Sequence, residues 1–128
     1  MRSLPPPSEL AGDAFDLCIS RVRDRNLKRR LVAAKPAIVS ASDRFIEAAA
    51  RFAAHEIAPH DLVDPDVTVD EMEGVCTDRM ANGSGPGRPV YEEIKNSAPN
   101  GRCPLCGHRQ VKTLDHYLPK SRYPSLAV

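Results

Sequence analysis

Two cysteines separated by two residues, in Cys103-Pro-Leu-Cys106-Gly107, constrain this 128-residue chain more than any other feature. Two thiolates three positions apart in a tight turn point at one ion, and the following glycine relieves the turn backbone. This geometry is typical of a zinc knuckle, and zinc is our main interpretation. A redox dithiol and plain structural thiols are the alternatives, although no strand-helix-strand pattern of the redox kind surrounds the pair.

The composition fits an intracellular domain that gains stability from a metal ion. Aromatic residues make up 5% of the chain and tryptophan is absent, so aliphatic residues must build a modest core. The N-terminus has no apolar stretch of the signal-peptide kind, and no apolar run reaches the ~18 residues that cross a membrane. We therefore expect a cytoplasmic, reducing location, where paired cysteines bind metal more often than they form disulfides. Cys18 and Cys76 fall within helical patterns and are expected to be buried.

The first two-thirds of the chain show the apolar spacing of helices. Pro36 is expected to end one short helix, and Ser40 or Ser42 to cap the next. Thr68 and Glu71 fit a capping box that opens a further helix. These helices say nothing about function by themselves.

A glycine-rich break at residues 82–87 is the best boundary in the chain. We expect a helical region over residues 1–82, a linker over residues 83–90 and a short metal-type segment over residues 91–128. Within that last segment, a short helix precedes the cysteines, and Gln110–Leu114 has strand character.

The charge is unevenly distributed although the formal net charge is only +1. Between Arg21 and Arg30, six of the ten residues are basic and Asp24 is the one acidic residue. Runs of this kind are most often solvated helix faces. The end of the chain is also basic, as a phosphate-binding surface would be.

Asp115 and His116 follow the cysteine turn closely. Histidine is the natural base near neutral pH, and a carboxylate is a natural ligand for a hard cation such as Mg²⁺. Holding a metal ion and activating water are the two tasks of phosphodiester cleavage. Most Asp-His pairs are surface or capping residues, so it is the position after a zinc-type turn that favours catalysis. Arg109, Lys120 and Arg122 are candidate phosphate contacts, and ordinary surface charge explains them equally well.

The cysteine turn and the later run Leu114-Asp-His-Tyr-Leu-Pro-Lys-Ser-Arg-Tyr-Pro-Ser-Leu-Ala-Val128 resemble the first half of an HNH endonuclease, of the ββα-metal family. The resemblance covers about Tyr91 to Val128. It implies a mainly α N-terminal region followed by a partial ββα-metal module stapled by zinc. The family pattern continues with an asparagine-containing loop, a second Cys-x-x-Cys and a closing histidine or asparagine. We therefore expect this chain to be a truncated segment that carries half of each metal site.

The resemblance also implies roles for individual residues. His116 would be the general base, and Asp115 would be a ligand of a single catalytic ion of the Mg²⁺ class. Cys103 and Cys106 would be half of a four-cysteine structural zinc site. The implied activity is metal-dependent hydrolysis of DNA, with the segment inactive by itself.

The helices before the cysteines, including Phe15-Asp-Leu-Cys-Ile19, are similar to the N-terminal regions of HNH proteins in bacterial anti-phage systems. Some of these systems, such as the Septu type, pair the nuclease with an ABC/SMC-like ATPase. The helical region would then dock that partner or shape a DNA groove. Two alternatives stay open: a non-catalytic zinc-type module that binds nucleic acid, and an interaction subunit that binds the ATPase.

Overall fold

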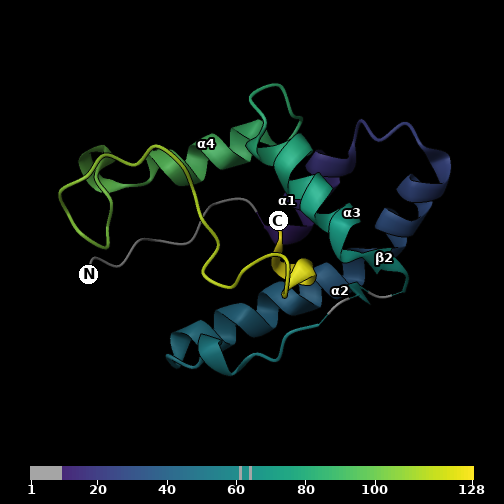
Figure 1. Cartoon of the computed structure of the whole chain (residues 1–128), viewed down its shortest axis with the longest axis horizontal. Helices are drawn as coiled ribbons and strands as arrows, with labels where there is room; N and C mark the ends of the chain where they lie inside the picture. The colour runs from purple at the N-terminus through teal and green to yellow at the C-terminus, as the bar shows by residue number, and fades with distance from the viewer. Residues whose placement is uncertain (1–9, 61, 64) are drawn as a thin grey trace.

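The computed structural model describes residues 10–60, 62–63 and 65–128, and in them the chain is mainly helical (Figure 1). This confirms the expected fold class in its coarse form, while the ββα-metal module stays a prediction. No helix in these residues is long and apolar enough to cross a lipid bilayer. The elements are α1 (Ala11–Ile19), α2 (Arg25–Ala50), η1 (Ala54–Glu56), β1 (Leu62–Val63), β2 (Val67–Thr68), α3 (Val69–Gly74), η2 (Val75–Ala81), α4 (Arg88–Asn96), η3 (Pro99–Gly101) and η4 (Pro124–Leu126).

The prediction that Pro36 ends a helix is wrong, because α2 runs through it as one helix of 26 residues. An interior proline removes a backbone hydrogen bond and usually bends a helix. Burial on both sides of the proline outweighs that cost, since α2 presents one continuous apolar stripe to the core. Ser40 and Ser42 consequently lie inside the helix and cap nothing. The fully buried residues of the stripe are Leu31, Ala34 and Ile38.

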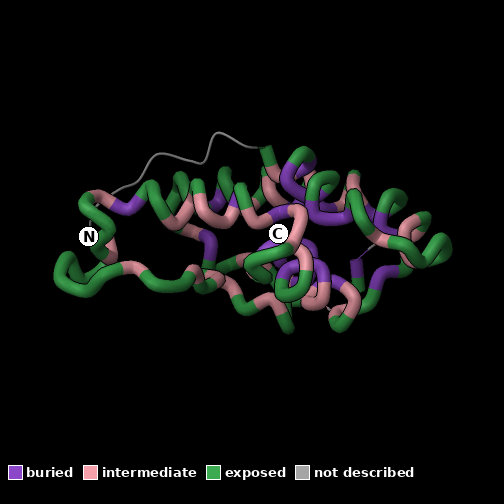
Figure 2. Tube along the Cα trace, turned by 90° about the horizontal axis from the view of Figure 1, so that it is seen from above, coloured by how far each residue is buried: buried purple, intermediate pink, exposed green. Residues whose placement is uncertain are grey.

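The core lies where α1, α2, the small antiparallel sheet and the α3–η2 helix meet. In Figure 2 the buried segments gather in this part of the molecule, while the cysteine hairpin at one end is exposed. Cys18 and Cys76 are both buried here, as predicted, and burial raises the pKa of Cys18 to about 11. The other core residues with no exposed surface are Phe15, Leu31, Ala34, Ile38, Val63, Val67 and Met72.

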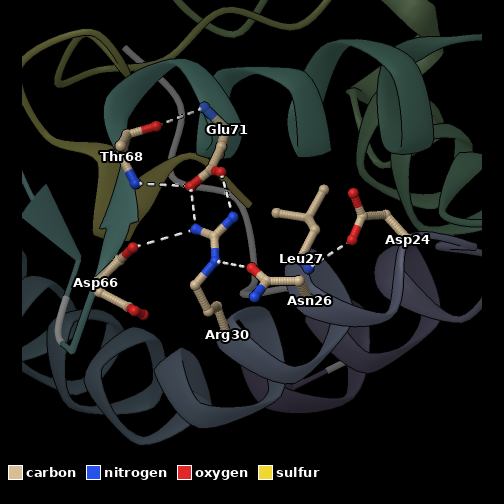
Figure 3. A network of polar contacts seen from close by, with 7 residues as sticks. All are labelled: Asp24, Asn26, Leu27, Arg30, Asp66, Thr68 and Glu71. Carbon is tan, nitrogen blue, oxygen red and sulfur yellow. Dashed lines mark hydrogen bonds and ion pairs between the residues drawn. The ribbon is translucent and has the colours of Figure 1, made fainter.

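One polar network fastens α3 to α2 (Figure 3). Arg30 of α2 donates to both carboxylate oxygens of Glu71, with Nη1···Oε2 at 2.7 Å and Nη2···Oε1 at 2.6 Å. These hydrogen bonds lower the pKa of Glu71 to about 2. Glu71 Oε2 also accepts from the backbone N–H of Thr68, and the Thr68 hydroxyl accepts from the N–H of Glu71. The predicted capping box is therefore confirmed, and its carboxylate also pairs with a second helix.

The helix that begins at Val69 changes to π-helical geometry at Val75 and stays so until Ala81. π-Helical turns are rare and often lie at functional sites. The chain then turns back tightly onto η2 and α1: a Cβ added at Gly87 would lie 2.4 Å from the sulfur of Cys18. Part of the segment predicted as a linker is therefore a closely packed turn, and α4 begins within it at Arg88.

The end of the chain returns to the helical region, where η4 contacts α2, α3 and β1. His60 holds it there. The His60 Nε2 atom lies 2.8 Å from Ser125 Oγ and accepts the Ser125 backbone N–H at 3.2 Å. The backbone N–H of His60 donates to the carbonyl of Arg122 at 2.9 Å. His60 therefore fastens the end of the chain to the helical region.

Candidate functional site

Cys103 and Cys106 lie on a hairpin that projects from the end of α4. The strand expected from Gln110 to Leu114 reduces to one antiparallel bridge, between Arg102 and Gln110. The residue after the second cysteine, Gly107, has a φ of +70°, which glycine adopts without strain. Three backbone hydrogen bonds close the hairpin: Cys103 N–H to Arg109 O at 2.7 Å, Gly107 N–H to Cys103 O at 2.7 Å and Val111 N–H to Gly101 O at 2.8 Å.

The sulfur of Cys106 is surrounded by hydrogen-bond donors. The backbone N–H groups of Arg109 and His108 lower the pKa of the Cys106 thiol, and the side chain of Cys103 acts in the same direction. This environment favours the thiolate, which is the form that binds metal. The cysteines are free thiols, so neither member of the pair is committed to a disulfide.

The cysteine pair fits half of a zinc site. Zinc in a closed structural site takes four ligands, and thiolate sulfur is a preferred one. Among the described residues no three His, Cys, Asp or Glu side chains gather as a possible metal site. Cys103 and Cys106 thus supply two suitable donors, and Asp115 and His116 do not join them.

His116 is half-buried at the edge of the core, and its ring has a defined orientation. Its Nε2 atom lies 3.0 Å from the carbonyl oxygen of Ala127. A carbonyl can only accept a hydrogen bond, so Nε2 carries the proton in the neutral ring and Nδ1 carries the free lone pair. Asp115 is exposed, and its Oδ1 accepts the backbone N–H of His116 at 2.9 Å. The pair therefore offers one basic nitrogen and one accessible carboxylate.

Cys76 is a neighbour of His116 that the sequence does not reveal. It lies on η2, and its sulfur is 3.9 Å from His116 Nε2. Hydrogen bonding to Cys76 is the main cause that raises the pKa of His116; the Ala127 carbonyl acts in the same direction and burial opposes both. The sequence predicts Cys76 only as a buried residue, since nothing in a separation of 40 positions indicates contact with His116.

The three predicted phosphate contacts differ in their surroundings. Lys120 Nζ donates to Thr77 Oγ1 of η2 at 2.8 Å, which holds this lysine near His116. The side chains of Arg109 and Arg122 are exposed, and in the described chain neither has a hydrogen bond or ion pair. A hollow of about 310 Å³ lies beside His116 and is lined mostly by apolar and aromatic residues. These are Phe45, Tyr117, Leu118, Leu126 and Val128, and Ser42 also lines it.

The chain is similar to protein ea31 of Escherichia phage lambda, with 23% identity over 135 residues. The alignment takes in the whole chain and 45% of the phage protein, so the chain spans less than half the length of this curated relative. No family model matches the sequence. No solved structure matches the chain.

Proposed function

We propose that this chain is the first half of a metal-dependent HNH endonuclease that hydrolyses DNA phosphodiester bonds, as the nuclease component of a bacterial anti-phage defence system. The observation that carries the proposal is the state of His116. Its ring is fixed by Ala127 at one nitrogen and keeps a lone pair on the other, directly after an exposed carboxylate. That arrangement suits a general base beside a metal ligand.

The residues of this chain would divide the work of cleavage. His116 Nδ1 would take the proton from the attacking water, while the Nε2 contact with Ala127 keeps the ring in the required tautomer. The carboxylate of Asp115 would hold a divalent cation of the Mg²⁺ class, which neutralises charge on the phosphate and the departing oxygen. Lys120, fixed by Thr77, and the exposed Arg109 and Arg122 would contact phosphates of the DNA.

The cysteine hairpin would have a structural role. Cys103 and Cys106 would bind one zinc ion together with two further ligands from outside the described residues. A closed zinc site contributes folding energy directly. Measuring the intact mass and the zinc content of the protein expressed from its own gene tests this assignment. About one zinc per chain, lost in the Cys103→Ser variant, is the expected result.

The catalytic proposal is tested by replacing His116 with alanine in the protein expressed from its own gene. Loss of a general base lowers the cleavage rate by about 100-fold or more, while binding to DNA is retained. His55→Ala is the matched control, because His55 is exposed and lies on η1. Cleavage that survives in His116→Ala would contradict the assignment. DNA binding without cleavage by the unchanged protein would favour the non-catalytic zinc-type module.

The defence partner is tested by co-expression. The helical region would dock an ABC/SMC-like ATPase, and the two proteins should then co-purify. Co-purification by a protein that never cleaves DNA would favour the interaction subunit instead.

A further inference from the structure

Four arginines lie close together in the sequence where α1 connects to α2, and their side chains do not take part in holding the described fold together. Arg21 and Arg23 lie on the connector, and Arg25 and Arg29 lie on the first turns of α2. All four are exposed, and in the part of the chain that the structure describes none of their side chains makes a hydrogen bond or ion pair. We call this surface the arginine corner (Arg21, Arg23, Arg25 and Arg29).

The other basic residues of the same run are used internally. Lys28 Nζ donates to the carbonyl of Ile19 at the end of α1 at 2.6 Å, and Arg30 pairs with Glu71. Asp24, the acidic residue within the run, accepts the backbone N–H of Leu27 as the cap of α2. The run therefore separates into two cations that hold the fold and four that face solvent.

Helix stability does not explain the arginine corner. The first turn of a helix favours negative side chains, because unpaired N–H groups place partial positive charge there. In α2 the first turn holds no acidic residue and begins with Arg25. A cation at that position opposes the dipole, so its placement works against folding. Arg25 and Arg29 are four positions apart on one helix face, so their charges also repel each other.

We propose that the arginine corner binds the phosphate backbone of nucleic acid without reading its sequence. Guanidinium groups match phosphate oxygens in a bidentate geometry, and clustered arginines gain most from releasing the counterions of DNA. An acidic protein is a poorer fit, because protein interfaces need apolar anchors. From Ser20 to Arg29 no large hydrophobic residue is exposed.

The proposal rests on the proposed function for its biological setting and adds a contact far from the cysteine hairpin. Figure 1 shows the α1–α2 connector and the hairpin toward opposite ends of the longest axis. Nucleic acid held at the arginine corner would therefore extend the footprint beyond the region of Lys120 and Arg109. The helical region would then be a DNA-binding part in its own right.

The test measures binding of a fluorescent random-sequence DNA duplex over a range of salt concentrations. Arg25→Gln/Arg29→Gln is compared with Arg44→Gln/Arg51→Gln, which removes the same charge from two exposed positions, one farther along α2 and one directly after its last residue. Loss of two phosphate contacts lowers the slope of log affinity against log salt by about 2 and weakens binding at low salt about tenfold. The control pair should leave the slope unchanged. A cooperative melting transition by circular dichroism shows that each variant is folded.

Unchanged affinity and slope in Arg25→Gln/Arg29→Gln would overturn the proposal. The outcome is independent of catalysis, because the assay measures binding alone. If the unchanged protein never cleaves DNA while Arg25→Gln/Arg29→Gln binds more weakly, the proposed function fails and the arginine corner stands. If His116→Ala loses cleavage while Arg25→Gln/Arg29→Gln binds DNA normally, the proposed function stands and binding at the arginine corner is refuted.

Discussion

The helical core and the cysteine hairpin of this chain are held together by different interactions. Phe15, Leu31 and Met72 have no exposed surface, and they come from three different helices, α1, α2 and α3. In the fully described stretch from Pro99 to Tyr123 no residue is buried, and the hairpin is closed by backbone hydrogen bonds. The core can be stable through apolar burial, whereas the hairpin depends on local geometry and on whatever binds its thiols.

The candidate catalytic pair lies at the border between these two regions. The His116 ring contacts Cys76 of η2 and the carbonyl of Ala127, and Ala127 is itself buried. The core therefore orients the proposed base, and the hairpin does not. Metal binding at the hairpin should therefore leave the orientation of the His116 ring unchanged.

The largest effect on stability is expected where apolar burial in the helical core is lost. Leu31→Ala leaves a cavity between α2 and the rest of the core and should lower the free energy of unfolding by about 3 kcal/mol. Leu105→Ala on the hairpin, where the side chain is 72% exposed, should change it by less than about 0.5 kcal/mol. Urea unfolding followed by circular dichroism measures both. Similar losses in the two variants would mean that the hairpin is part of the cooperative core.

The sequence predicts features of this fold that are local. The capping box needs only Thr68 and Glu71, three positions apart, and it is confirmed. The glycine after the second cysteine belongs to the same class, since the turn itself requires it. Burial of Cys18 and Cys76 is also confirmed, and it follows from the usual burial of free cysteines within helical patterns.

Features that depend on contacts between distant parts of the chain could not be predicted from the sequence. Pro36 fits a helix end by every local rule, and α2 continues because buried residues on both sides keep it on the core. The neighbours of His116 are equally hidden, because Cys76 comes from a π-helical segment and the other partner is a backbone carbonyl. Neither partner has a sequence signal that links it to a histidine.

The second prediction concerns two glycines of the turn between η2 and α4. Alanine at Gly87 would place its Cβ 2.4 Å from the sulfur of Cys18 and should lower the free energy of unfolding by about 2 kcal/mol, as overpacking does. At Gly83 no atom of the described residues, apart from its two chain neighbours, lies within 4 Å of such a Cβ, so alanine there should change the free energy of unfolding by less than about 0.5 kcal/mol. Thermal or urea unfolding of the two variants checks this. Equal stability of the two alanine variants would show that the backbone of the turn shifts to accommodate the added methyl group and is not packed as part of the core.

The third prediction concerns the polar joint between α2 and α3. Glu71→Gln removes the charge that pairs with Arg30 and should lower the free energy of unfolding by about 1 kcal/mol at pH 7, since the pair is partly exposed. The pKa of Glu71 is lowered from 4.5 to about 2, so the carboxylate stabilises the fold above pH 4.5. That contribution disappears as the pH falls toward about 2.

Unfolding of the wild type and Glu71→Gln over this pH range gives the measurement. The difference in stability between the two proteins should shrink steadily below pH 4.5 and be lost as the pH falls through about 2. Asp43→Asn, which changes an exposed carboxylate in the interior of α2, is the control and should change the stability little. A constant difference between wild type and Glu71→Gln across the range would contradict an electrostatic origin.

The smallest effect on global stability is expected for a substitution on the hairpin, at Gly107. Gly107 has a φ of +70° and open space around the position of a Cβ, so an added side chain strains the backbone without a clash. Gly107→Ala should cost the hairpin about 1 kcal/mol and weaken zinc binding about fivefold, while global unfolding changes by less than about 0.5 kcal/mol. Gly107→Asn should retain more of the zinc affinity, because asparagine tolerates this conformation. Zinc titration and urea unfolding of the same samples separate the two quantities. If global stability falls together with zinc affinity, the hairpin is coupled to the core, and the orientation of His116 would then depend on the metal after all.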